Sequence, residues 1–227
     1  MSANASRLLS TLDQKAAPGN AAVIVVDVQN DFVADGGFFA SIGADVQKLQ
    51  RSVIPTLDRF LKKARDAKVL VVFIQAIYDE QYRSDAMLER KLRMRNDRWP
   101  CISGTWGAEF FGVAPLPGDP VVIKHRYSGM LNTGLNALLR GHGVTSLLMT
   151  GIATDTCVDC TARDAYFMDY YVSIVSDCCG ALSEDDHTSA LKRFARDYGE
   201  VVSSQDVMEA WKRIQIGGSG QPARRHA

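Results

Sequence analysis

Six short segments of the chain are almost continuously apolar and rich in β-branched residues, a pattern typical of strands buried on both faces. They occupy residues 21–28, 69–75, 121–123, 145–149, 171–176 and 200–203. Between them, apolar residues recur every three or four positions, which predicts helices at residues 44–67, 86–95, 133–140, 156–169, 184–196 and 206–214. Strands that alternate with helices predict an α/β fold, in which a parallel sheet carries helices on both faces.

The two ends of the chain lack this periodicity. Residues 1–20 are interpreted as an N-terminal leader or arm, and a short helix that packs on the body or on a neighbouring subunit is expected around Leu8, Leu9 and Leu12. Residues 215–227 are predicted to be a disordered tail because Gly, Ser and Arg dominate their end. Residues 21–214 then form a single domain.

Two internal stretches are irregular. Residues 29–43 are predicted to be a loop, and residues 76–119 are mostly loop around the helix expected at 86–95. An irregular stretch as long as the second is usually a functional loop or an interface.

The composition excludes several function classes. The 227 residues include 26 basic and 26 acidic side chains, so no net charge favours nucleic acid or an anionic membrane. No run is apolar enough to span a bilayer, and the N-terminus does not resemble a secretion signal. Five cysteines without a repeating spacing suit reduced thiols better than a disulfide framework. We therefore expect a cytoplasmic protein.

Three chemically capable residues lie where predicted strands end. Asp27 lies at the end of the first strand, Lys124 follows the third, and Cys157 lies at the start of the helix that follows the fourth strand. The carboxyl ends of parallel strands form the usual ligand site of such folds, so the three side chains are expected to meet. At a helix N-terminus, free N–H groups and the helix dipole favour a thiolate at Cys157.

This trio suits acyl transfer by a thiol nucleophile. Asp27 can accept the thiol proton, and Lys124 can stabilise the anion and hold the carboxylate in place. Backbone N–H groups of Cys157 and near Ala153 would form an oxyanion hole if both point inward. Structural explanations stand beside this one: Asp27 as a capping residue, Lys124 as part of a solvated basic turn, and Cys157 as an inert buried thiol.

Other cysteine chemistry is also open. Cys157 and Cys160 form a CxxC pair, which is compatible with a dithiol oxidoreductase, although that mechanism leaves Asp27 and Lys124 unused. Zinc could bind Cys157, Cys160, Cys178 and Cys179, but adjacent cysteines are poorly spaced to chelate one tetrahedral ion. The four histidines show no ligand spacing, so no metal and no cofactor are expected. A binding scaffold without catalytic activity is a further alternative.

The motifs around these residues resemble the isochorismatase-like cysteine hydrolases. They are Val25-Val26-Asp27-Val28-Gln29-Asn30-Asp31-Phe32, Lys124, and Gly151-Ile152-Ala153-Thr154-Asp155-Thr156-Cys157-Val158. The resemblance implies a three-layer α/β/α fold with a six-stranded, mostly parallel sheet and a catalytic triad of Asp27, Lys124 and Cys157. It also implies a cis peptide between Ile152 and Ala153, with the N–H groups of Ala153 and Cys157 as oxyanion hole, and homo-oligomers, tetrameric or dimeric.

Within that family, residues 79–82 and 126–129 are most similar to ureidoacrylate amidohydrolases. Ala76-Ile77-Tyr78 replaces the Asn-Gly-Trp of those enzymes, and Cys160 replaces a serine or threonine. Residues 75–82 lack the Asp-x-His pattern of metal-assisted nicotinamidases, and the presence of Cys157 argues against a vinyl-ether hydrolase.

The sequence therefore predicts an amidohydrolase that cleaves a C–N bond of a small ureido, carbamoyl or carboxamide substrate through an acyl or carbamoyl intermediate on Cys157. A ureidoacrylate-like substrate is favoured, with biuret, triuret and N-carbamoyl amino acids as alternatives. The residues expected to line the substrate pocket are Phe32, Gln75, Tyr78, Trp106 and Tyr127.

Overall fold

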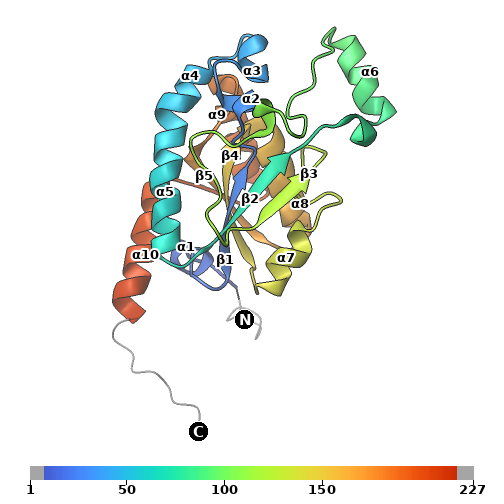
Figure 1. Ribbon diagram of the computed structural model, residues 1–227. Helices are drawn as coiled ribbons and strands as arrows, with labels where there is room; N and C mark the ends of the chain where they lie inside the picture. Colours follow the sequence, from blue (N-terminus) through green and yellow to red (C-terminus); the bar gives the residue numbers. More distant parts are fainter. Residues whose placement is uncertain (1–7, 219–227) are drawn as a thin grey trace.

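The computed structural model describes residues 8–218 and contains a single six-stranded sheet (Figure 1). The strands are β1 (Ala21–Val26), β2 (Leu70–Ala76), β3 (Val121–Lys124), β4 (Ser146–Ile152), β5 (Tyr171–Gly180) and β6 (Glu200–Val202). All neighbouring strands are parallel, in the order β3-β2-β1-β4-β5-β6. The expected six-stranded α/β architecture is confirmed.

The strand order reverses direction between β1 and β4. From β1 the chain proceeds outward through β2 to β3 and then returns to the centre as β4. Val26 of β1 is in register with Gly151 of β4, so the two strands end side by side. In a parallel sheet this reversal opens a crevice beyond the carboxyl ends of the strands.

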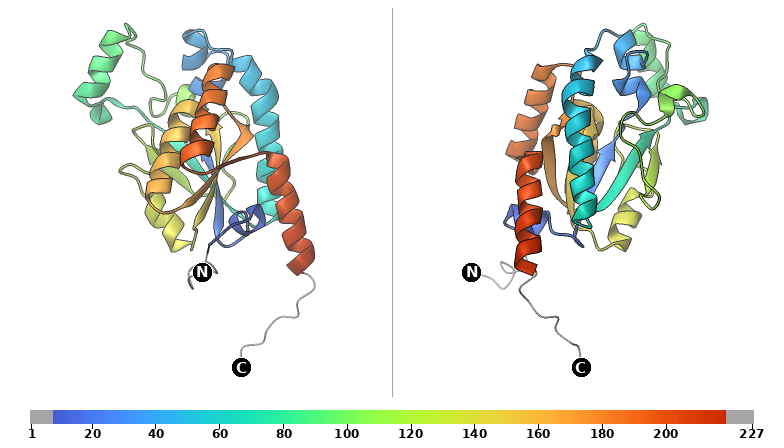
Figure 2. Two further views of the ribbon diagram at one scale, coloured as in Figure 1. Left: turned by 180° about the vertical axis from the view of Figure 1, so that it is seen from behind. Right: turned by 60° about the vertical axis from the view of Figure 1, so that its left-hand side comes forward.

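Helices cover both faces of the sheet (Figures 1 and 2). Helices α5 (Ile54–Asp66) and α10 (Ser204–Gly218) lie on one face, and α7 (Leu135–Gly141), α8 (Asp159–Phe167) and α9 (Glu184–Asp197) lie on the other. The structure is thus a three-layer α/β/α sandwich.

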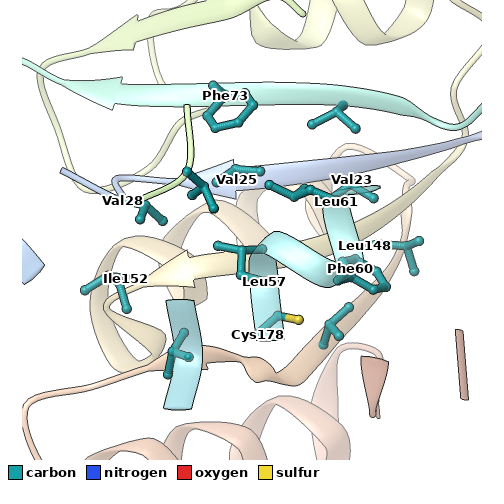
Figure 3. Packing of buried hydrophobic residues seen from close by; sticks show 14 of the residues in the cluster. Val23, Val25, Val28, Leu57, Phe60, Leu61, Phe73, Leu148, Ile152 and Cys178 are labelled. Atoms are coloured by element: carbon teal, nitrogen blue, oxygen red, sulfur yellow. The ribbon is translucent and has the colours of Figure 1, made fainter. Parts of the chain in front are cut away.

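Side chains of β1 alternate between two hydrophobic cores. Val23 and Val25 pack with Leu57 and Phe60 of α5 in the first core, as Figure 3 shows. Ala22, Ile24 and Val26 point the other way and join the second core, beneath α7 and α8. Burial on both faces explains why this strand is apolar at every position.

Short helices form in two places where the sequence predicts something else, a loop in one and a single long helix in the other. Residues 29–43, predicted to be a loop, contain α2 (Asn30–Val33) and α3 (Phe38–Ser41). The helix predicted at 44–67 begins as α4 (Val46–Lys48) and passes through a π-helical turn (Leu49–Val53) before α5. Four-residue helices are too short to show a 3.6-residue period, and one π turn leaves the apolar period nearly unchanged.

The N-terminal arm is attached to the body within the described residues. Helix α1 (Leu12–Lys15) is capped by Thr11 and packs against α10. The carbonyl of Ala16 accepts a 2.8 Å hydrogen bond from Nε1 of Trp211. Helix α10 extends to Gly218, so the beginning of the predicted tail is helical. The rest of the tail, residues 219–227, and residues 1–7 lie outside the described residues.

The long stretch after β2 leaves the body of the molecule and returns. It contains a 3-10 turn (Glu80–Tyr82), α6 (Asp85–Arg93) and a second 3-10 turn (Trp106–Ala108) before β3. Helix α6 projects beside the carboxyl ends of the strands (Figures 1 and 2), and none of its residues is buried. Within residues 8–218, no helix combines the length and apolar character needed to cross a bilayer.

Candidate active site

The structure brings Asp27, Lys124 and Cys157 together beyond the carboxyl ends of the strands. Asp27 directly follows β1, Lys124 is the last residue of β3, and Cys157 lies in a π-helical turn (Thr154–Val158) between β4 and α8. Asp27 turns the chain away from the sheet with a φ of 51°, a left-handed conformation that aspartate tolerates better than most residues. The sheet therefore collects three groups from distant parts of the sequence.

Asp27 and Lys124 form a fully buried ion pair. Nζ of Lys124 lies 2.7 Å from Oδ2 of Asp27, and neither side chain is exposed. The same ammonium donates to the backbone carbonyls of Arg126 and Tyr127, each at 2.9 Å. These two hydrogen bonds and the ion pair with Asp27 offset the cost of burying the charge.

Burial dominates the ionisation of Asp27. It raises the pKa of the Asp27 carboxyl above the ordinary 3.8, although Lys124 opposes the shift. Burial by itself would lower the pKa of Lys124, but Asp27 and Cys157 outweigh it and keep the ammonium protonated.

The Cys157 thiol is buried and interacts with both members of the ion pair. Burial raises its pKa, Lys124 lowers it, and Asp27 raises it further. The sequence-based expectation of a thiolate favoured by the helix N-terminus is therefore wrong for the unliganded site. Loss of solvent and the adjacent carboxylate both raise the pKa of Cys157, which favours the thiol over the thiolate.

The turn that carries Cys157 is fastened at both ends. The peptide bond between Ile152 and Ala153 is cis. The carbonyl of Ala153 accepts hydrogen bonds from the N–H groups of Thr156 and Val158, both at 3.1 Å. Neither bond uses the N–H of Ala153 or of Cys157. The hydroxyl of Thr161 donates to the carbonyl of Cys157 at 2.6 Å and accepts from the N–H of Gly129 at 2.9 Å.

Cys157 opens into a cavity of about 620 Å³, whereas Asp27 and Lys124 lie behind it without lining the space. Three of the five residues predicted to line the pocket do so: Phe32, Tyr78 and Tyr127. Burial raises the pKa of the Tyr78 phenol well above 10.0 and also raises that of Tyr127, so both are neutral donors at physiological pH.

Gln75 and Trp106 do not line this cavity. The amide of Gln75 donates a 2.9 Å hydrogen bond to the carbonyl of Ala108 and borders a separate surface pocket. Alternation along β2 gives Gln75 the face that Phe73 occupies. The ring of Trp106 is 51% exposed and lies against Gly36. The position of Gln75 near the end of β2, and that of Trp106 in the long segment before β3, did not determine which way their side chains point.

The basic side of the cavity includes two residues, Arg90 and Lys91, that the sequence analysis did not single out. Arg90 and Lys91 of α6 line it, together with Arg126 from the loop after β3 and Asp155 from the turn before Cys157. Trp99 lies beside Lys91, whose ammonium is 5.0 Å from its ring centre, and the guanidinium of Arg83 lies 4.5 Å from the same ring centre. The sequence signal for this side of the cavity was the unusual length of the mostly irregular stretch 76–119.

The cysteines do not gather into a second site. Adjacent residues of β5 point to opposite faces of the sheet, so Cys178 lies in the first core and Cys179 in the second. They cannot chelate one ion, which removes the tetracysteine zinc alternative. Among residues 8–218, no three His, Cys, Asp or Glu side chains form a group that could hold a metal.

Comparisons with known proteins agree with this geometry. The Isochorismatase domain profile matches residues 21–206. Ureidoacrylate amidohydrolase RutB from Enterobacter sp. (strain 638) is 35% identical over 208 residues, which cover 86% of this chain and 90% of the relative. A cysteine hydrolase from Pseudomonas syringae pv. phaseolicola 1448A has a TM-score of 0.74 at 25% identity, with 86% of this chain and 94% of that chain covered. N-carbamoylsarcosine amidase from Thermoplasma acidophilum has a TM-score of 0.65 at 26% identity, with 82% and 96% covered. The profile match and the identity to the curated relative show that the chain belongs to the isochorismatase family.

Proposed function

We propose that this isochorismatase-family amidohydrolase uses Cys157 as its nucleophile to hydrolyse a terminal carbamoyl group of a small ureido substrate. One observation supports the mechanism above all: the Cys157 thiol faces a substrate-sized cavity while Asp27 and Lys124 form a buried ion pair directly behind it. Neither charge touches solvent, so each acts on the thiol without competition from water.

In the first half-reaction the thiol loses its proton as it attacks. Asp27 accepts the proton from Cys157, and the sulfur adds to the urea carbonyl carbon. The N–H groups of Ala153 and Cys157 are assigned to the resulting oxyanion. Asp27 then returns the proton to the departing nitrogen, the C–N bond breaks, and ammonia leaves a carbamoyl thioester on Cys157.

In the second half-reaction water replaces the sulfur. Asp27 accepts a proton from water as its oxygen adds to the thioester carbonyl, and the collapse of the tetrahedral intermediate expels the Cys157 thiolate. The thiolate recovers the proton from Asp27, and a carbamic acid departs, which then loses its proton to water as carbamate. Lys124 remains protonated throughout and keeps the Asp27 carboxylate in place. No step requires a metal or a redox partner.

The substrate assignment rests on relatives and on motif similarity. RutB is named a ureidoacrylate amidohydrolase, and the Thermoplasma acidophilum enzyme an N-carbamoylsarcosine amidase. Both names describe compounds with a carbamoyl nitrogen, which favours ureidoacrylate first and N-carbamoyl amino acids second. Tyr78 replaces a tryptophan of the ureidoacrylate enzymes beside the cavity, and this departure bears on the size of the substrate.

A pair of cysteine variants tests the mechanism. Cys157→Ala should abolish ammonia release while circular dichroism and the denaturation midpoint stay close to wild type, since the side chain faces a cavity. Cys160→Ser is the matched control and should retain activity, because Cys160 lies outside the cavity lining. Mass spectrometry with a slow substrate should place a carbamoyl adduct on Cys157. Turnover by Cys157→Ala, or an adduct on another cysteine, would overturn the mechanism.

A substrate comparison tests the carbamoyl assignment independently. The values of kcat/KM for ureidoacrylate, biuret, N-carbamoyl amino acids and nicotinamide should be highest for the ureido acids. If nicotinamide is preferred by more than about tenfold, a gap of about 1.4 kcal/mol in transition-state binding, the assignment is wrong even if Cys157 is the nucleophile.

A further inference from the structure

We propose that Arg90 on α6 determines specificity by binding a carboxylate on the substrate, with Arg126 as a second cation beside it. The inference rests on the proposed hydrolysis of ureido acids and assigns the residue that recognises their carboxylate. A neutral urea such as biuret lacks the group that these cations would bind.

The cavity has an excess of positive charge. Three cationic side chains line it, Arg90, Lys91 and Arg126, against one carboxylate, Asp155. The cations repel one another: burial lowers the pKa of Lys91, and the neighbouring charges of Arg90 and Arg83 lower it further. A bound anion would relieve this repulsion, whereas a neutral ligand would not.

Two of the three cations already have partners. Nη1 of Arg126 donates to the carbonyls of Tyr82 and His125, at 2.8 and 2.7 Å. The Lys91 ammonium donates to the carbonyl of Arg98 and lies 4.6 Å from the ring centre of Phe38. These contacts fix both charges in position but reduce the donors left for a ligand.

Arg90 is different because its guanidinium is uncommitted. Within the described part of the chain it forms no ion pair, whereas Arg93 on the same helix pairs with Glu89 at 3.2 Å. Its positive charge nevertheless reaches the substrate side of the cavity, where it lowers the pKa of Tyr127 against the effect of burial. A free, planar guanidinium can bind a carboxylate through two parallel hydrogen bonds.

The position of these charges sets the orientation of the substrate. The Cys157 turn provides the nucleophile and the Asp155 carboxylate, whose Oδ1 is buried and lacks a hydrogen-bond partner among the described residues. A carboxylate there disfavours an anionic group near Cys157 and accepts N–H groups instead. The urea end of a ureido acid therefore suits the Cys157 side, and its carboxylate suits the α6 side.

Two isosteric probes isolate the charge: 3-ureidopropionate and its amide, 3-ureidopropionamide. Binding would be measured by calorimetry on the full chain carrying Cys157→Ala, so that neither probe is consumed. We expect the acid to bind about tenfold more tightly than the amide, and R90Q to remove most of that preference. R93Q is the matched control from the same helix and should keep it. R90K should keep part of the preference for the acid, because lysine supplies the positive charge without the paired N–H donors of a guanidinium.

The kinetics of the otherwise wild-type chain provide a second readout. R90Q should raise KM for a ureido acid while leaving kcat nearly unchanged, as expected when binding is lost equally from ground and transition states. Equal binding of acid and amide, failure of the acid to bind saturably, or an acid preference that survives R90Q would overturn the inference. None of these outcomes bears on whether Cys157 is the nucleophile, which the Cys157→Ala and adduct experiments decide separately.

Discussion

At the residue scale, Asp27 has two roles: it is the proposed proton carrier, and its carboxylate pairs with the buried Lys124 ammonium. Asp27→Asn should abolish turnover because the amide cannot accept the thiol proton. It should also lower the free energy of unfolding by about 3–5 kcal/mol, because an unpaired charge remains buried. Urea denaturation would measure this loss; an unchanged midpoint would show that Lys124 does not depend on its partner.

The pH dependence of the wild type separates the catalytic role of Asp27 from its structural one. The base form of Asp27 is the carboxylate, which is present above its pKa, and burial raises that pKa above 3.8. A plot of kcat/KM against pH should therefore fall on the acid side with a midpoint above 3.8, as Asp27 gains its proton. A midpoint at or below the ordinary aspartate value would exclude Asp27 as the base.

At the element scale, the close pairing of β1 with β4 depends on one glycine. Gly151 has a φ of +112°, and a Cβ there would lie 2.1 Å from the carbonyl oxygen of Val26 and 2.6 Å from its nitrogen. Gly151→Ala should destabilise the fold by ~3 kcal/mol or more, because the backbone of β1 must move. Gly141→Ala, at the end of α7, meets no atom within 4 Å and should stay within ~1 kcal/mol of wild type. Equal denaturation midpoints for the two variants would contradict this account.

Strands and long helices could be predicted because their buried positions are apolar and recur with the period of the element. β1 is apolar at every position, since both of its faces are covered, and α5 repeats its apolar residues at helical spacing. The helices α2 and α3 were missed because four residues complete only about one turn. Their position depends on tertiary contacts instead: Oδ1 of Asp31 accepts a 3.0 Å hydrogen bond from the N–H of Phe38.

Only part of the candidate site could be predicted from the sequence. Asp27, Lys124 and Cys157 could be placed because the carboxyl ends of parallel strands lie at the same edge of the sheet. The direction of Gln75 could not be predicted, because it depends on which face of β2 the residue occupies. The position of Arg90 could not be predicted either, because the segments that connect α6 to the sheet are mostly irregular. The resting thiol of Cys157 was likewise hidden, since its ionisation depends on buried neighbours rather than on its place in the sequence.

At the scale of the whole molecule, we expect the activity to be independent of metal ions. The imidazole Nδ1 of His125 lies 2.8 Å from the carbonyl oxygen of Ile77, and that of His187 lies 2.8 Å from the hydroxyl of Thr154. His142 is bonded to its own helix. Prolonged dialysis against a strong chelator should therefore leave kcat/KM unchanged. Loss of activity that zinc restores would show that a ligand set was overlooked.

Helix α6 contributes charged residues to the cavity and no buried residue to the body. A segment of this kind can diverge in sequence at little thermodynamic cost, because its substitutions remove no core contacts. The Asp27–Lys124 pair has no such freedom. Selection for a new substrate would therefore act first on α6 and the chain around it, while the buried pair stayed the same. Exchange of this segment between relatives offers a direct route to altered substrate preference on an unchanged catalytic core.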